Sequence, residues 1–169
     1  MSITLDQFIA AVESRGPSLR DDDLRQFESE IGCRLPDDYR EFLLRCNGGF
    51  VEADLWFLGP NPAGDSVEAG VHHVGGLRSD DESYSLRWAR ECYQGARPRI
   101  PLELLWIMDD PCGNAVCLGV KSAARGKIYF WDHVLESAEW DSALDSAPHL
   151  TLLAESFTEF IRGLEEDPD

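Results

Sequence analysis

The most regular hydrophobic pattern of the chain lies between Leu104 and His133, where three short apolar runs follow one another. They are Leu104–Met108, Ala115–Val120 and Ile128–Trp131, and Pro and Gly residues stand in the connectors between them. Short apolar runs bounded by turn residues predict an antiparallel β-meander. Side chains alternate between the faces of a strand, and here both faces are largely apolar. We therefore expect cover on one face of the sheet and at least partial cover on the other.

Apolar residues at helical spacing precede the meander, and each predicted helix has start and stop signals. The first begins at Thr4, which with Gln7 forms a capping box, and the second follows Asp21. The third has Pro36 at its first position. Their expected stops are Gly16–Pro17, Gly32 and Asn47–Gly49. Every feature of Asn47–Gly49 has a structural explanation, so a ligand-binding loop there is the less favoured interpretation.

The remaining segments carry weaker patterns. We expect strands at Phe50–Leu58 and Val71–Leu77, a loop at Gly59–Gly70, a helix at Asp80–Gln94, an acidic irregular segment at Leu135–Ala147, a last helix at Leu152–Leu164 and a frayed acidic tail at Glu165–Asp169.

Length and composition indicate one soluble globular domain. The chain has 169 residues, 43% of them hydrophobic and 28% charged. A chain of this size buries roughly 70% of its unfolded surface, which is enough for a core without disulfides or metals. We find no signal peptide and no apolar run that could cross a membrane. The five cysteines form no C-x-x-C pair, and Cys46 and Cys117 fall on apolar faces. Reduced thiols without an export signal predict a cytoplasmic protein.

The formal net charge of −17 bears most directly on partners. It argues against nucleic acid and against anionic membranes. The acidic residues are concentrated between Asp132 and Asp169, where Arg162 is the single base. Such a surface serves solubility, or it attracts a basic protein partner by speeding encounter and setting orientation.

Two pairs of residues are candidates for chemistry. His72 and His73 suggest a metal, but neighbours on a strand point to opposite faces, so an ordinary strand or loop pair is the favoured interpretation. Asp109-Asp110 and Asp132-His133 lie at the ends of adjacent predicted strands, where a carboxylate beside a histidine could perform acid–base work. Aspartates that simply favour turns explain the same pattern. We find no nucleophile elbow, Walker loop or H-E-x-x-H motif.

Three separated motifs together resemble the SUKH superfamily. The first joins Leu35-Pro36-x-x-Tyr39-x-x-Phe42-Leu43 to Asn47-Gly48-Gly49. The second joins Gly113-Asn114 to Gly126–His133, and the third is Ser156-Phe157-x-x-Phe160. The resemblance spans roughly residues 24–164.

The resemblance implies an α+β fold, with a central and mostly antiparallel β-sheet packed by N-terminal helices and a C-terminal helix. Residues 1–169 would form a single SUKH-like domain with its core at about 24–164 and a short acidic tail. The superfamily includes bacterial immunity proteins, which bind and neutralise a cognate polymorphic toxin, often a nuclease, and a fungal cell-wall synthesis regulator. The short chain is more similar to the bacterial kind.

We therefore expect a non-enzymatic, cytoplasmic immunity protein without cofactor or metal, whose partner is a basic toxin domain. The expected partner-binding residues are Asp109, Asp110, Glu136, Glu139, Trp140 and Asp141. Their carboxylates would steer association, and Trp140 would either anchor the partner or pin the acidic segment to the core. Two alternatives remain open: a regulatory protein-interaction scaffold, and a small hydrolase that uses Asp132 and His133.

Overall fold

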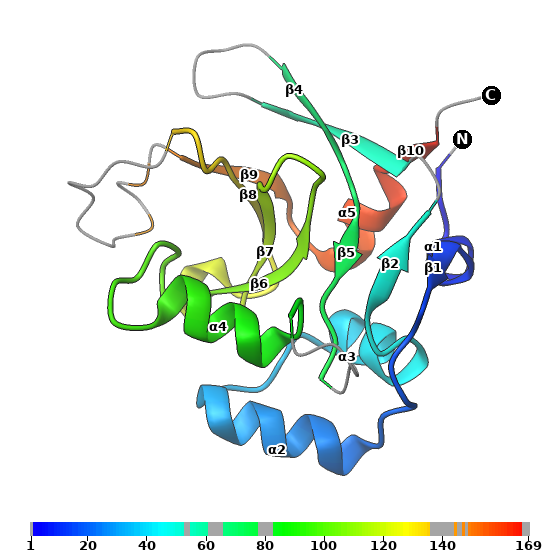
Figure 1. The fold of residues 1–169 in the computed structure, drawn as a ribbon, viewed down its shortest axis with the longest axis vertical. Coiled ribbons are helices and arrows are strands. Elements are labelled where there is room, and N and C mark those ends of the chain that lie inside the picture. Colours follow the sequence, from blue (N-terminus) through cyan, green and yellow to red (C-terminus); the bar gives the residue numbers. More distant parts are fainter. Residues whose placement is uncertain are drawn as a thin grey trace.

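The computed structural model describes residues 2–52, 55–60, 66–77, 83–135, 144, 147 and 149–166 (Figure 1). The helices are α1 (Leu5–Ala11), α2 (Asp21–Ile31), α3 (Asp37–Arg45), α4 (Leu86–Gln94) and α5 (Phe157–Arg162), with a 3-10 turn at Ser122–Ala124. The strands are β1 (Val12–Glu13), β2 (Gly49–Val51), β3 (Leu55–Pro60), β4 (Ser66–Gly70), β5 (His73–Val74), β6 (Leu104–Asp109), β7 (Ala115–Gly119), β8 (Ile128–Trp131), β9 (Leu150–Ala154) and β10 (Glu165–Glu166).

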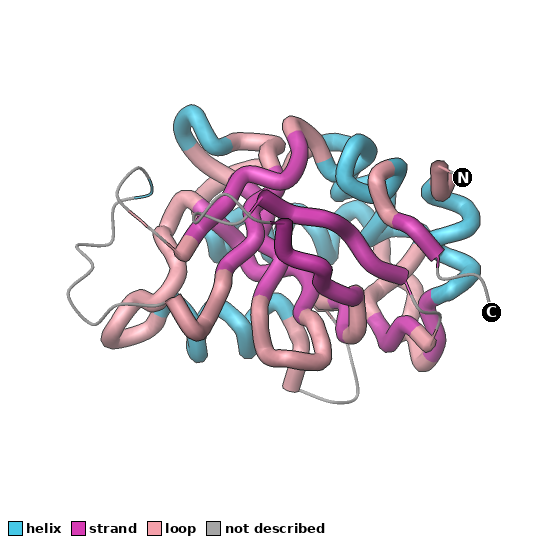
Figure 2. Tube along the Cα trace, turned by 90° about the horizontal axis from the view of Figure 1, so that it is seen from above, coloured by secondary structure: helices cyan, strands magenta, loops and turns pink. Residues whose placement is uncertain are grey.

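These strands form two antiparallel sheets. The larger has the order β1-β2-β5-β6-β7-β8-β9, and the smaller has the order β10-β3-β4. The strands cross the middle of the molecule and the helices lie around them (Figure 2). The fold is α+β, as predicted from the motifs.

The predicted meander is confirmed as strands β6, β7 and β8. Every residue of β7 is buried, so both faces of the sheet are covered. On one face Trp131 of β8 lies 5.5 Å from Tyr93 of α4, measured between ring centroids. On the other face Phe130 lies 5.7 Å from Phe57 of β3. The alternation read from the sequence therefore places α4 on one side of the meander and the small sheet on the other.

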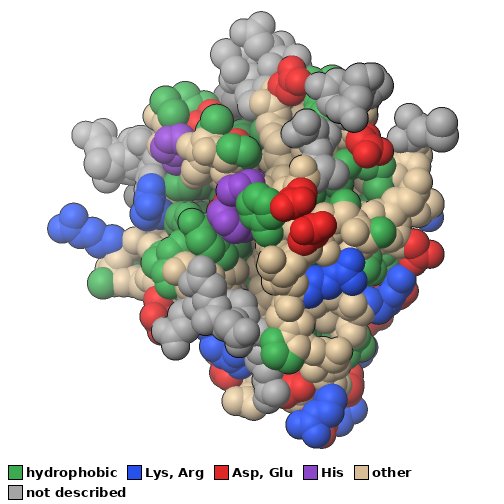
Figure 3. Space-filling model, turned by 45° about the vertical axis from the view of Figure 1, so that its right-hand side comes forward, with side chains coloured by type: hydrophobic (Ala, Val, Ile, Leu, Met, Phe, Trp, Pro, Cys, Tyr) green, Lys and Arg blue, Asp and Glu red, His purple; other side chains and the backbone are tan. Residues whose placement is uncertain are grey.

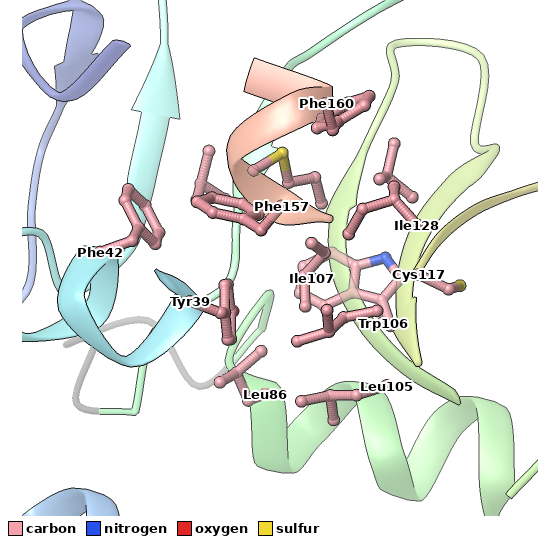
Figure 4. Close-up of a cluster of buried hydrophobic side chains, with 14 of the residues drawn as sticks. Tyr39, Phe42, Leu86, Leu105, Trp106, Ile107, Cys117, Ile128, Phe157 and Phe160 are labelled. Carbon is pink, nitrogen blue, oxygen red and sulfur yellow. The ribbon is translucent and has the colours of Figure 1, made fainter. Parts of the chain in front are cut away.

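A cluster of aromatic side chains joins α3 to the C-terminal helix α5. The Phe157 ring of α5 lies 5.1 Å from Tyr39 and 5.2 Å from Phe42, both on α3. Phe160, one turn later, lies 5.3 Å from Phe57 of β3. Figure 4 shows Tyr39 and Phe42 pointing toward Phe157 beside the strands. The first and third sequence motifs therefore meet in the core, because both supply its aromatic side chains.

The start and stop signals of the N-terminal helices are largely correct. Thr4 and Gln7 form the predicted capping box, and Gly32 ends α2 with a left-handed φ of 71°. The helix α1 ends at Ala11, before the predicted Gly16–Pro17, because Val12 pairs with Val51 in the large sheet. Pro36 is the residue before α3 and not its first residue.

The Asn47-Gly48-Gly49 motif holds three chain segments together. The Asn47 side chain donates to the Pro17 carbonyl and accepts from the Leu77 backbone N–H, at 2.8 and 2.7 Å. Gly48 has a φ of 66°, and a Cβ there would lie 2.6 Å from the Val74 carbonyl. The close backbone approach therefore requires glycine and supports the structural interpretation of the motif.

Several expected boundaries are wrong. The single strand predicted at Phe50–Leu58 is two strands, β2 and β3, which belong to different sheets. The C-terminal helix is shorter than predicted, because Leu150–Ala154 pairs with β8 and Ser156 caps α5. Glu165 and Glu166, predicted as part of a frayed tail, pair with β3. In the segment predicted as a strand at Val71–Leu77, only β5 is a strand, and the described part of the Asp80–Gln94 helix begins at Leu86.

Candidate functional site

A cleft of about 870 Å³ lies where the two sheets meet. Its walls come from the end of β2, from β3 and β4, from the segment before β5 and from the turn after β6. The side chains that give it chemical character are Phe50, Glu52, Trp56, Glu68, His72 and Pro111.

The cleft combines aromatic and acidic side chains. Phe50 and Trp56 are half-buried, whereas Glu52 and Glu68 are exposed. Figure 3 shows histidine, hydrophobic and acidic side chains side by side on one face of the molecule. Aromatic faces next to carboxylates attract a lysine or arginine side chain, because the ring quadrupole and the negative charge act in the same direction. The cleft is therefore suited to a basic side chain of a partner.

His72, His73 and Asp109 converge beside this cleft. The Nδ1 atom of His73 lies 3.0 Å from Oδ1 of Asp109, and Nδ1 of His72 lies 3.9 Å from the same oxygen. One ligand atom from each of the three residues lies within 4.8 Å of the others. The side chains of His72, His73 and Asp109 are 33%, 22% and 14% exposed, so the cluster is partly shielded but accessible.

The expectation that His72 and His73 point away from each other is wrong. Their ring centroids are 4.1 Å apart. Of the two histidines, His73 lies in β5 and His72 directly precedes it. The backbone N–H of His72 donates to the Asp109 carbonyl at 2.9 Å, and that of His73 donates to the Asp109 carboxylate at 3.0 Å. Asp109 is therefore the common hydrogen-bond acceptor for the backbone N–H groups of both histidines.

The carboxylates of Asp109 and Asp110 are both used within the chain. Burial raises the pKa of Asp109 above its ordinary value, although the hydrogen bonds and charge of His73 oppose this. Asp110 is buried and accepts from the backbone N–H groups of Cys112 and Asn114 at 2.9 and 2.8 Å, which shapes the turn. The carboxylates of Asp109 and Asp110 therefore hold other groups of the chain in place, whereas those of Glu52 and Glu68 are exposed.

Asp110 and His133 are near each other, as the strand ends suggested, but Asn114 stands between them. The Asn114 side-chain amide donates to Asp110 at 2.8 Å, and its oxygen lies 2.8 Å from Nδ1 of His133. Asp132 accepts from the Val134 backbone N–H at 2.9 Å. The contacts of His133 and Asp132 are thus those of a hydrogen-bonded turn.

The sequence profile of the SMI1 / KNR4 family (SUKH-1) matches residues 18–163. The chain belongs to this family. It is also similar to the SPbeta prophage-derived uncharacterized protein YokK of Bacillus subtilis (strain 168). The two sequences are 30% identical over 169 aligned positions, which cover 91% of this chain and 79% of YokK.

Membership in SUKH-1 supports a protein-binding role of the immunity type or a related one. The motif residues that carried the resemblance lie in the core, in caps and in turns: Tyr39 and Phe157 are buried, and Gly113 has a left-handed φ of 89° in the turn before β7. These residues therefore have structural roles in the fold.

Four of the expected partner-binding residues, Glu136, Glu139, Trp140 and Asp141, lie outside the described residues. The segment that leads to them is exposed: Val134 is 75% and Leu135 is 41% exposed. None of the helices in the described part of the chain combines the length and the apolar composition that a membrane crossing requires.

The cysteines provide no activated thiol in the core. Burial raises the pKa of Cys46 to about 11 and raises that of Cys117 as well. Since the thiolate is the nucleophile, a raised pKa and burial both oppose reactivity. Both behave as the small core hydrophobes that the sequence predicted.

Sequence reasoning missed the cleft itself. Phe50, Trp56, Glu68 and His72 lie between residues 50 and 72, but they come from different strands and segments, and Pro111 joins them from a distant turn. No regular spacing in the sequence marks them as one group. The usable signals were local: a charged residue, Asp109, at the end of an otherwise apolar strand, and the pair His72-His73 in a predicted strand.

Proposed function

We propose that this SUKH-1 protein is a non-enzymatic, cytoplasmic immunity protein. It binds and neutralises a basic toxin, and the toxin class that we propose is a nuclease. The observation that carries the proposal is the acidic and aromatic cleft between the two sheets, in a family of the immunity type. A nuclease is basic where it holds phosphates. An acidic inhibitor can therefore occupy that surface and block it.

Two groups of acidic residues contribute to binding in this proposal. Glu52 and Glu68 flank the aromatic side chains of the cleft and receive a basic side chain of the toxin. Glu136, Glu139 and Asp141 supply further negative charge for steering, with Trp140 as an anchor. The formal net charge of −17 favours the encounter over a longer range.

The first experiment identifies the partner. The tagged chain is used to capture proteins from its host at low ionic strength and again at about 0.15 M salt. We expect one basic, toxin-like protein that is released as the salt concentration rises. Several unrelated partners, or none, would contradict the proposal, and several would favour the regulatory scaffold.

The second experiment tests the cleft with charge reversals. The double variant Glu52→Lys/Glu68→Lys should slow association with the captured toxin by at least about tenfold, because steering by charge contributes roughly 10–1000-fold to association rates. The matched control is Asp22→Lys/Glu91→Lys, which alters exposed residues of α2 and α4 and changes the net charge equally. Equal slowing by both variants would show that overall charge acts and that the cleft does not.

The third experiment separates binding from catalysis. Residual toxin activity is titrated against increasing amounts of the chain. A binding inhibitor protects in proportion to its amount and completes protection at a fixed molar ratio. Full protection by a small fraction of that ratio would indicate turnover, and would require the hydrolase alternative that uses Asp132 and His133 to be tested by substitution.

A further inference from the structure

The cluster of His72, His73 and Asp109 has the donor set of a transition-metal site. It offers two imidazole nitrogens and one carboxylate, each within 4.8 Å of the others. Imidazole ligands suit zinc and neighbouring divalent metals, whereas magnesium and calcium prefer sites made of oxygen alone. Two histidines and a carboxylate also form a recurrent three-ligand zinc arrangement, in which the fourth position stays open.

The separations between the candidate ligand atoms are close to those of such a site. Zinc bonds of about 2.0–2.2 Å in a tetrahedral arrangement place two ligand atoms about 3.3 Å apart. The two nitrogen–oxygen separations here are 3.0 and 3.9 Å. They lie on either side of that value, and all three ligand atoms lie within 4.8 Å of one another. Rotation of the side chains would bring them around one ion.

Neighbouring groups hold the ligands in this arrangement. The Tyr84 ring stacks on His73 with centroids 3.6 Å apart and an angle of 12° between the planes. Phe50 meets both histidines edge-on, at 4.6 Å for His72 and 5.7 Å for His73. The His73 backbone N–H donates to Asp109 at 3.0 Å and fixes the carboxylate. Partners that orient the ligands in this way are typical of metal sites.

Tyr84 has a strained backbone. Its φ is 66°, a left-handed value that a bulky side chain rarely adopts. Strain of this kind persists only where the surrounding structure imposes it, and it is concentrated at functional positions. Here it accompanies the stacking of the Tyr84 ring on His73.

A metal ion could reach the cluster from two hollows. His72 lines the large cleft, and His73 lines a second hollow of about 220 Å³ that is also lined by Phe50 and Tyr84. The three side chains are partly exposed, so ligand exchange from water is possible.

We propose that His72, His73 and Asp109 bind one zinc ion, with a fourth coordination position open to water or to a donor atom of a ligand. This proposal does not depend on toxin binding, because it concerns only the affinity of the isolated chain for the metal. Its alternative is a histidine–aspartate hydrogen-bonded cluster that binds no metal.

The test is a titration of the metal-free full-length chain with zinc, followed by calorimetry, and with cobalt, followed by its visible absorption. The exposed thiols of Cys92 and Cys112 are first replaced by serine, so that they do not contribute adventitious ligands. We expect one ion per chain, no thiolate-to-cobalt charge-transfer band, and no comparable binding of magnesium.

The variants His73→Asn and Asp109→Asn should each weaken zinc binding by at least about tenfold. Loss of a partner outside the coordination sphere already costs roughly 10–100-fold, and loss of a ligand costs more. Asp109→Asn keeps the size of the side chain and an oxygen that accepts from the His73 N–H, so it should stay folded. Its circular dichroism spectrum and thermal midpoint verify this.

His133→Asn is the matched control, because His133 is an exposed histidine in a turn and lies outside the cluster. It should leave the zinc affinity unchanged. The proposal is overturned if zinc does not bind stoichiometrically, if folded Asp109→Asn retains the parent affinity, or if His133→Asn loses as much affinity as His73→Asn.

Discussion

Tyr39 is a core residue whose aromatic ring and hydroxyl group contribute differently to stability. Its side chain is fully buried, and its hydroxyl has no hydrogen-bond partner in the part of the chain that the structure describes. Burial also raises the pKa of Tyr39, so the hydroxyl stays neutral. The ring carries the stability of this position, through its contacts with Phe42 and Phe157.

We therefore expect Tyr39→Phe to keep or raise the free energy of unfolding, by up to about 1 kcal/mol, because it removes an unpaired buried polar group. Tyr39→Ala, the control, should cost about 3–5 kcal/mol through the loss of the ring. Urea denaturation measures both. A loss of more than about 1 kcal/mol in Tyr39→Phe would show that the hydroxyl has a partner.

At the scale of single residues, the candidate site could be predicted only in part from the sequence. The pattern identified His72, His73 and Asp109 individually, but the rule of alternating strand faces separated the two histidines. That rule failed here: the two rings lie 4.1 Å apart, and the backbone N–H groups of both histidines donate to Asp109. The contacts of Phe50 and Tyr84 with these histidines depend on tertiary packing, which no local pattern encodes.

At the scale of elements, Asp38 joins the two helices that carry the aromatic cluster. It lies in the first turn of α3, and its carboxylate accepts from the Thr158 backbone N–H of α5 at 3.0 Å and from the Thr158 hydroxyl at 3.2 Å. Its neighbour Asp37 is exposed and forms a surface ion pair with Arg34. Both aspartates lie in the first turn of α3, where the helix dipole favours them, but of the two only Asp38 bonds to Thr158 of α5.

Asp38→Ala should lower the free energy of unfolding by about 2 kcal/mol, since hydrogen bonds to a charged acceptor are worth roughly 1.5–3 kcal/mol. Asp37→Ala should change it by no more than about 0.5 kcal/mol, as is usual for exposed ion pairs. Chemical denaturation of the two variants side by side checks the difference. Equal effects would mean that the helix dipole, and not the bond to Thr158, explains the value of Asp38.

Elements with strong periodicity and clear caps could be predicted from the sequence, as α2 and the meander show. The predicted helix at Leu152–Leu164 merged a strand with a helix, because Leu153 stands four residues before Phe157 and so continues its apolar stripe. Pairing of Leu150–Ala154 with β8 overrode that local pattern. In the same way, the run Phe50–Leu58 looks continuous in sequence, but its two halves pair with different strands.

At the scale of the whole molecule, charge is the dominant property. The chain holds 32 acidic residues against 15 basic ones. The ion pairs among the described residues, such as Arg87 with Glu30 between α4 and α2, involve only part of the acidic side chains. Net charge far from zero keeps a protein soluble and steers it toward partners of opposite charge, but it opposes the compact state by self-repulsion. The charge that the proposed function uses therefore has a cost in stability.

This cost predicts the effect of salt on the free chain. Raising the ionic strength from about 0.01 M to about 0.15 M shortens the Debye length from roughly 30 Å to roughly 8 Å and screens the long-range repulsion. Exposed ion pairs weaken too, but each is worth little. The thermal midpoint should therefore rise with salt, equally for sodium and potassium chloride, while association with a basic partner slows. A midpoint that falls with salt would show that local ion pairs outweigh the repulsion, and the acidic surface would then be a source of stability in its own right.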